Sequence, residues 1–89
     1  MIKETVPIIN KLGLHARAAA KLVSTATRFE SSIKIARNGK EVDGKSIMSV
    51  MMLAASCGTD VDLIVEGSDE KEAIAALKEL ISDRFGEDE

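Results

Sequence analysis

Residues 16–44 read ARAAAKLVSTATRFESSIKIARNGKEVDG, and their pattern changes from helical to extended partway along. In the first half, the apolar residues recur at the spacing of one helix face: Ala19, Leu22, Val23, Ala26 and Phe29. In the second half, Ile33 and Ile35 share one face of a strand, and Asn38-Gly39 is a strong signal for a two-residue turn. The stretch therefore predicts a helix followed directly by a β-hairpin.

The segment before this helix predicts a strand and then a turn. Residues 2–9 are rich in β-branched residues, and Ile2, Val6 and Ile8 share one alternation phase. Pro7 favours either a place at the edge of the sheet or a ladder position that needs no N–H, because proline donates no ladder hydrogen bond. Residues 10–14 then predict a loop, with Gly13 as its turning point.

The second half of the chain predicts a short helix, a strand and a final helix. Ser46 is expected to be the N-cap of a short apolar helix that ends near Gly58. In residues 59–66, Val61, Leu63 and Val65 alternate strictly, as in a half-buried strand. Ser68 is expected to cap the final helix, and the acidic tail FGEDE, residues 85–89, is expected to fray.

The predicted order is therefore β-α-β-β-α-β-α, which favours an α+β fold. We expect an open-faced two-layer sandwich, with a four-stranded antiparallel sheet and three helices on one face. At 89 residues the chain forms one domain, residues 1–89, and cannot also enclose a deep substrate cavity. Any chemistry is expected at the surface, close to a partner.

The charge and aromatic content argue against nucleic acid as a partner. The formal net charge is −3, and the chain has two Phe but no Tyr or Trp. Binding to phosphate backbones needs a basic surface, and single-strand binders stack bases on aromatic side chains. No segment approaches the roughly 20 apolar residues of a membrane span, and the N-terminus does not resemble a signal peptide. We expect neither nucleic-acid binding nor membrane insertion.

The cysteine and histidine counts limit other kinds of site. Cys57 is the only cysteine, so no disulfide can form within the chain, and a cytoplasmic location is expected. Cys57 itself is expected to be a small apolar residue at the end of a helix. With one histidine and no C-x-x-C motif, the chain has too few soft ligands for a metal site. We expect no metal and no cofactor.

His15 is expected where the loop meets the first helix. The first-turn N–H groups of a helix have no acceptor within it, and together with the helix dipole they form an anion site. They also favour a neutral imidazole, whose lone pair can act as a nucleophile. Arg17, in the same turn, has the planar guanidinium that grips a phosphate through two hydrogen bonds. On these residues alone two roles stay open: a nucleophile that carries phosphate, or a helix cap beside a solvated arginine.

Two longer motifs carry a resemblance to a known family. NKLGLHARAAA, residues 10–20, resembles the active-site signature of the HPr family, the histidine-containing phosphocarrier proteins of the bacterial phosphotransferase system. GKSIMSVMMLAASCGT, residues 44–59, resembles the second signature of that family, around its regulatory serine. The chain length and the predicted order of elements also match, so the resemblance covers essentially the whole chain.

The resemblance implies a carrier that forms a phosphohistidine intermediate, rather than an enzyme. His15 would accept a phosphoryl group from enzyme I charged by phosphoenolpyruvate, Arg17 would stabilise it, and an enzyme IIA domain would receive it during sugar transport. Ala18 stands where family members commonly have proline. Alanine presets the first helical turn less, so a looser active-site turn is expected.

The second motif leaves two interpretations open for each of its main features. Ser46 is either an ordinary N-cap or, as the resemblance implies, also a site for HPr kinase/phosphorylase. Ile47, Met48 and Met51 either belong to the core or form a docking patch beside His15, for which flexible methionine is well suited.

Other functions remain as alternatives. The carrier could serve a nitrogen-related regulatory relay instead of sugar uptake. A regulatory docking module without phosphotransfer is disfavoured by His15, because the regulation-only relatives of the family lack that histidine. A monomer is expected.

Overall fold

The computed structural model describes residues 1–87 and confirms the predicted order of elements. The strands are β1 (Ile2–Pro7), β2 (Ser32–Arg37), β3 (Lys40–Asp43) and β4 (Asp60–Glu66). The helices are α1 (Ala16–Ala26), α2 (Ile47–Met52) and α3 (Glu70–Ser82), followed by a 3-10 turn, η1 (Arg84–Gly86). β1 ends at Pro7 rather than at residue 9. α1 ends three residues before Phe29, because the chain there forms tighter turn hydrogen bonds.

The strands form one antiparallel sheet in the order β1-β4-β2-β3. β1 therefore lies at an edge, as Pro7 predicts. In the hairpin between β2 and β3, Asn38 and Gly39 have positive φ angles of 52° and 81°. This is the backbone of the tight turn that an Asn-Gly pair favours, so the predicted turn is confirmed.

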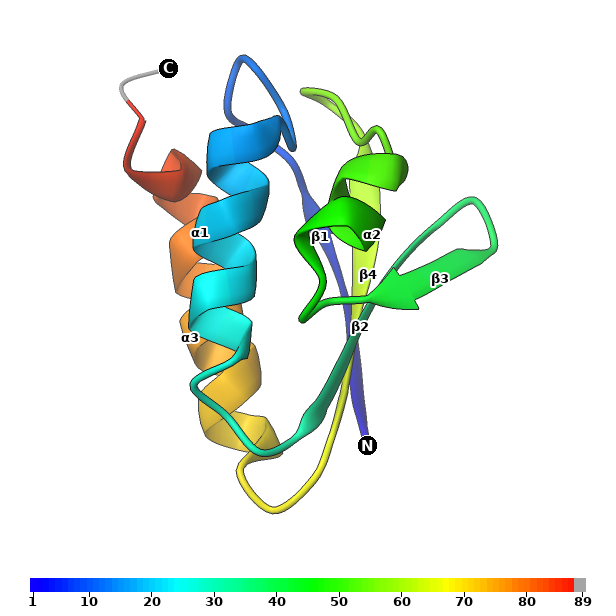
Figure 1. Cartoon of the computed structure of the whole chain (residues 1–89), viewed down its shortest axis with the longest axis vertical. Coiled ribbons are helices and arrows are strands. Elements are labelled where there is room, and N and C mark those ends of the chain that lie inside the picture. The colour runs from blue at the N-terminus through cyan, green and yellow to red at the C-terminus, as the bar shows by residue number, and fades with distance from the viewer. Residues whose placement is uncertain (88–89) are drawn as a thin grey trace.

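The helices cover one face of the sheet, and the core lies between the two layers (Figure 1). The largest fully buried side chains come from both layers: Phe85, Ile8, Leu22, Ile33, Ile35, Leu63 and Leu77. Burying one such side chain stabilises a fold by about 1.5–3 kcal/mol. On the opposite face Thr5 donates a hydrogen bond to Asp62 at 2.6 Å, and Lys34 is exposed. The structure is thus the expected open-faced sandwich.

Helix α2 is shorter than predicted, because it ends at Met52 rather than near Gly58. Ala54 has a positive φ of 52°, a left-handed conformation that cannot continue a helix. Arg37 in β2 donates from Nη1 to the carbonyl oxygens of the two residues after the helix, at 2.6 and 3.2 Å. These bonds satisfy acceptors that the helix end leaves free. Cys57 therefore lies in an exposed loop, and the prediction of a small apolar residue at a helix end was wrong.

Helix α3 begins differently from the prediction. Asp69 occupies the N-cap position, and Ser68 is exposed. The Asp69 carboxylate accepts from the backbone N–H groups of Glu30 and Ser31, at 2.9 and 3.0 Å, and from the Ser31 hydroxyl. The hydrogen bonds from Ser31 and Glu30 lower the pKa of Asp69. The local capping rule failed here because the partners of Asp69 lie far away in the sequence.

The C-terminal segment is ordered as far as the structure describes it. Phe85 is fully buried, and η1 packs against α1 and α3. The prediction of a frayed tail was therefore wrong for residues 85–87, while residues 88–89 lie outside the described residues. A single aromatic residue in an acidic run has no periodicity, so the sequence pattern gave no sign of its burial.

Candidate functional site

His15 occupies the N-cap position of α1, with extended backbone angles. Its side chain makes no capping hydrogen bond to the helix, so the interpretation of His15 as a helix cap is wrong for the imidazole. The ring is partly exposed, at 28% of its side-chain surface. The imidazole is therefore available for another role.

The loop before His15 is held against the loop that follows α2. Leu14 donates its backbone N–H to the carbonyl oxygen of Ala55 at 2.9 Å, and its side chain is buried. Gly13 has a φ of 69°, as its predicted role as a turning point requires. Asn10 is fully buried and donates to the carbonyl oxygen of Gly13 at 2.8 Å. Contacts within the loop and across to the second motif thus fix the position of His15.

The first turn of α1 offers donors to an anion. Its leading N–H groups have no acceptor within the helix, and they lie at the positive end of the helix dipole. Arg17 is exposed and makes no hydrogen bond or ion pair with any residue from 1 to 87. Ala18, at the position that differs from the family pattern, is fully buried. The start of α1 therefore offers an anion the N–H groups of its first turn and one guanidinium without a partner among residues 1–87.

A carboxylate that the sequence analysis missed also contacts the imidazole ring. Glu87 Oε2 contacts His15 Nε2, and Glu87 Oε1 accepts from Asn10 Nδ2 at 3.0 Å. The hydrogen bond from Asn10, with the contact to His15, outweighs desolvation and lowers the pKa of Glu87. Nothing in the sequence pattern could have found this residue, because it follows His15 by 72 positions in an acidic tail.

Ser46 is the N-cap of α2, as predicted. Its hydroxyl oxygen accepts from the backbone N–H of Ser49 at 3.3 Å, and the side chain is partly exposed. The capping role is therefore confirmed, and phosphorylation of Ser46 stays a prediction.

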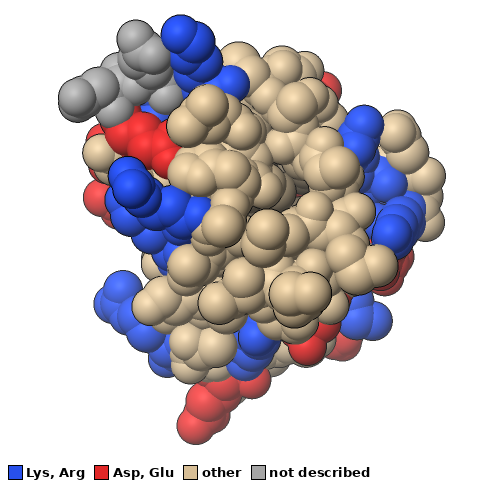
Figure 2. Space-filling model, turned by 45° about the horizontal axis from the view of Figure 1, so that its top comes forward, with Lys and Arg blue, Asp and Glu red and all other residues tan. Residues whose placement is uncertain are grey.

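The apolar residues of α2 divide between the core and the surface. Val50 is fully buried, whereas the exposed fractions of the other four are 42% for Ile47, 72% for Met48, 39% for Met51 and 63% for Met52. We call these four exposed residues the α2 patch, and they do not belong to the core. Because α1 and α2 pack together, the patch lies at the same end of the molecule as the start of α1 (Figure 1). Figure 2 turns this end forward and shows a broad uncharged surface with Lys and Arg gathered at its margins.

Neither a metal centre nor a membrane helix is found in the described part of the chain. Among residues 1–87, no group of three or more His, Cys, Asp and Glu side chains could hold a metal ion. Within the same residues no helix has the length and apolar character needed to cross a membrane.

Comparisons with known proteins identify the family of the chain. The family model described as "PTS HPr component phosphorylation site" matches residues 2–83. Phosphocarrier protein HPr of Cupriavidus necator is 57% identical over 89 residues, which cover 100% of both chains. The crystal structure of HPr-C-His from Thermoanaerobacter tengcongensis has a TM-score of 0.96 at 49% identity and covers 100% of both chains. The HPr dimer from the same organism has a TM-score of 0.79 at 50% identity, covering 98% of this chain and 100% of that one. The chain therefore belongs to the HPr family of phosphocarrier proteins.

Proposed function

We propose that the protein carries a phosphoryl group on His15, from enzyme I charged by phosphoenolpyruvate to an enzyme IIA domain. The observation that carries the proposal is the imidazole at the start of α1, which makes no capping hydrogen bond to the helix. Arg17, two positions further along the chain, has no hydrogen-bond or ion-pair partner among residues 1–87. Nε2 contacts Glu87, whereas Nδ1 makes no hydrogen bond within the same residues. A nucleophilic nitrogen and a set of anion donors therefore lie within one turn of helix.

The transfer step follows from this geometry. The lone pair of Nδ1 forms a bond to phosphorus, while the bond between phosphorus and the donor breaks and its electron pair stays on the donor. The negative charge of the phosphoryl oxygens is met by the first-turn N–H groups and by Arg17. A second transfer reverses these bond changes on an acceptor. The phosphoramidate bond is labile, which suits a group held only in transit.

Labelling by enzyme I tests this proposal. The protein, its His15→Ala variant and its Arg17→Ala variant are each incubated with enzyme I and labelled phosphoenolpyruvate. We expect an acid-labile, base-stable phosphate on the wild type, none on His15→Ala, and slower labelling of Arg17→Ala. Label on His15→Ala equal to that on the wild type would contradict the assignment.

We further propose that the α2 patch docks the partners. Its exposed methionines are flexible and polarizable, which suits a surface that must meet several partners in turn. Met48→Glu should weaken binding to enzyme I, because it places a charge in the patch. Ala75→Glu is the matched control, since it adds the same charge at an exposed position of α3. Equal binding of the two variants would contradict docking through α2.

Ser46 is proposed as a regulatory site for HPr kinase/phosphorylase. A phosphate at this N-cap would add a charge of about −1.5 to −2 next to the α2 patch. Docking to an acidic partner surface would then weaken, while the negative charge is tolerated at a helix start. Labelling by lysate and ATP should disappear in Ser46→Ala, and undiminished labelling of that variant would contradict the proposal.

The receiving partner and the assembly state belong to the same proposal. Transfer to purified IIA domains of the sugar-uptake and nitrogen-related classes distinguishes the two relays, because the class that receives the phosphoryl group faster is the partner class. We propose that the carrier works in the cytoplasm as a monomer, which light scattering tests directly. A stable dimer would contradict the monomer.

A further inference from the structure

The segment after α3 brings a negative charge back to the start of α1. The Glu87 carboxylate is only 14% exposed and contacts Nε2 of His15. We propose that Glu87 is a positioning residue that keeps a proton on Nε2 of His15 and so leaves the lone pair on Nδ1. This inference rests on the proposed phosphocarrier role of His15.

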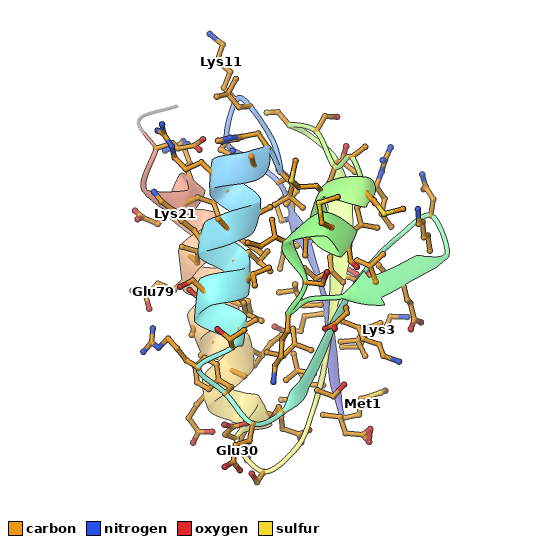
Figure 3. The ribbon with its side chains drawn as sticks, viewed as in Figure 1. Met1, Lys3, Lys11, Lys21, Glu30 and Glu79 are labelled. Carbon is orange, nitrogen blue, oxygen red and sulfur yellow. The ribbon has the colours of Figure 1, made fainter. Side chains whose placement is uncertain are left out.

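The Glu87 carboxylate follows directly after η1, a turn that packs against the rest of the protein. Phe85, in the middle of η1, is fully buried, and Lys21 of α1 donates to its carbonyl oxygen at 2.6 Å. Figure 3 shows Lys21 extending from α1 on the side where the C-terminal segment lies. The backbone N–H of Glu87 in turn donates to the carbonyl oxygen of Arg84 at 2.9 Å. These contacts fix the backbone from which the Glu87 side chain reaches the imidazole.

Asn10 ties this carboxylate to the loop that carries His15. Its buried Nδ2 donates both to the carbonyl oxygen of Gly13 and to Glu87 Oε1, at 2.8 and 3.0 Å. Together with the contact to His15, this hydrogen bond lowers the pKa of Glu87 and keeps the group ionised at neutral pH. Lys21 favours the ionised form further. One amide therefore aligns the carboxylate with the histidine loop.

An ionised carboxylate determines which imidazole nitrogen bears the proton. Both carboxylate oxygens are acceptors only, so a hydrogen bond to Nε2 requires Nε2 to be the donor. In a neutral ring the lone pair then lies on Nδ1. A hydrogen bond at one ring nitrogen fixes the state of the other in the same way at metal-bound histidines.

The same contact acts during the transfer itself. When Nδ1 bonds to phosphorus, the ring keeps its Nε2 proton and becomes positively charged. The carboxylate of Glu87 faces that proton and stabilises the charged ring. When the phosphoryl group leaves, the N–P electron pair returns to Nδ1, and the proton remains on Nε2 throughout.

The test compares Glu87→Gln with Glu79→Gln. A Gln side chain at position 87 can accept from Nε2 or donate to it, so it removes the preference while keeping the shape. Glu79→Gln removes one negative charge from an exposed position of α3 and is the matched control. For each protein, 15N NMR of the neutral imidazole gives the tautomer, and labelling by enzyme I gives the phosphorylation rate. Backbone amide spectra verify the fold.

We expect Glu87→Gln to show more of the Nδ1–H tautomer and a rate about tenfold lower, within the range for loss of a histidine-orienting partner. The control should match the wild type in both measurements. An unchanged tautomer or an unchanged rate in Glu87→Gln would overturn the inference. If enzyme I labels none of the proteins, the proposed function fails, whereas the tautomer measurement still decides where Glu87 holds the proton.

Discussion

Gly13 lies at the closest approach between the loop before His15 and the loop after α2, and Gly13→Ala tests how tightly the two are joined. A Cβ atom at this position would lie 2.6 Å from the carbonyl oxygen of Ala55 and 2.8 Å from Cα of Ser56. Both are backbone atoms, so no side-chain rotation relieves the overlap. Gly39→Ala is the matched control, because Gly39 also has a positive φ but a Cβ atom there would meet nothing within 4 Å.

Both variants lose folding free energy because alanine is strained at a positive φ angle, but only Gly13→Ala also loses free energy through steric overlap. A left-handed alanine costs about 1–2 kcal/mol. The loss of glycine freedom in the unfolded chain offsets about 0.4–1 kcal/mol of this. Overpacking adds about 1–3 kcal/mol at Gly13 alone. The difference between the variants should therefore be about 2 kcal/mol, or about 10 °C in melting temperature at about 4–8 °C per kcal/mol for a domain of this size.

Urea denaturation of both variants measures this difference, and the amide shifts of residues 13–16 report whether the loop has moved. Equal losses of stability at the two positions would refute the reasoning, because the loop at Gly13 would then have moved to make room for the Cβ atom with no loss of free energy. A loss at Gly39 as large as that expected at Gly13 would refute the division into backbone and steric parts.

Three further changes test other parts of the fold. Phe85→Ala should lower the free energy of unfolding by about 3–5 kcal/mol, because it empties a fully buried site; a loss below about 1 kcal/mol in urea would contradict that packing. Asp69→Asn should destabilise the protein at neutral pH. Because the pKa of Asp69 is lowered in the folded protein, its ionised carboxylate stabilises the fold at pH values above the ordinary pKa of 3.8. This stabilisation is lost as the pH falls through the folded-state pKa. Thermal melts of wild type and variant should therefore converge in acid, and a difference that does not change with pH would count against it. Arg37→Met should cost about 1–3 kcal/mol and speed amide exchange at Ala54, because two helix-end carbonyl groups lose their donor; unchanged exchange would exclude this role.

Local signals account for most of the fold. Asn38-Gly39 predicts its turn because the required positive φ angles restrict the residues that fit. Pro7 predicts the sheet edge because it lacks a donor. Ser46 predicts the start of α2 because a hydroxyl before an apolar run can satisfy a first-turn N–H. Each of these rules depends on a few neighbouring residues.

The parts that the sequence did not reveal depend on distant contacts. The early end of α2 involves Arg37, which lies on a strand, and the start of α3 involves an Asp69 carboxylate that bonds to another loop. At the candidate site, sequence reasoning could single out His15 and Arg17, because they lie two positions apart at the start of one helix. Glu87 could not, because its role depends on how Phe85 is buried.

The most direct test of the central claim is NMR of the protein after phosphorylation by enzyme I and phosphoenolpyruvate, with 15N in its single histidine. We expect one phosphorus signal coupled to Nδ1 of His15, and its loss when a IIA domain is added. A phosphorus signal coupled to Nε2, or one that persists in His15→Ala, would contradict the claim that Nδ1 of His15 carries the phosphoryl group.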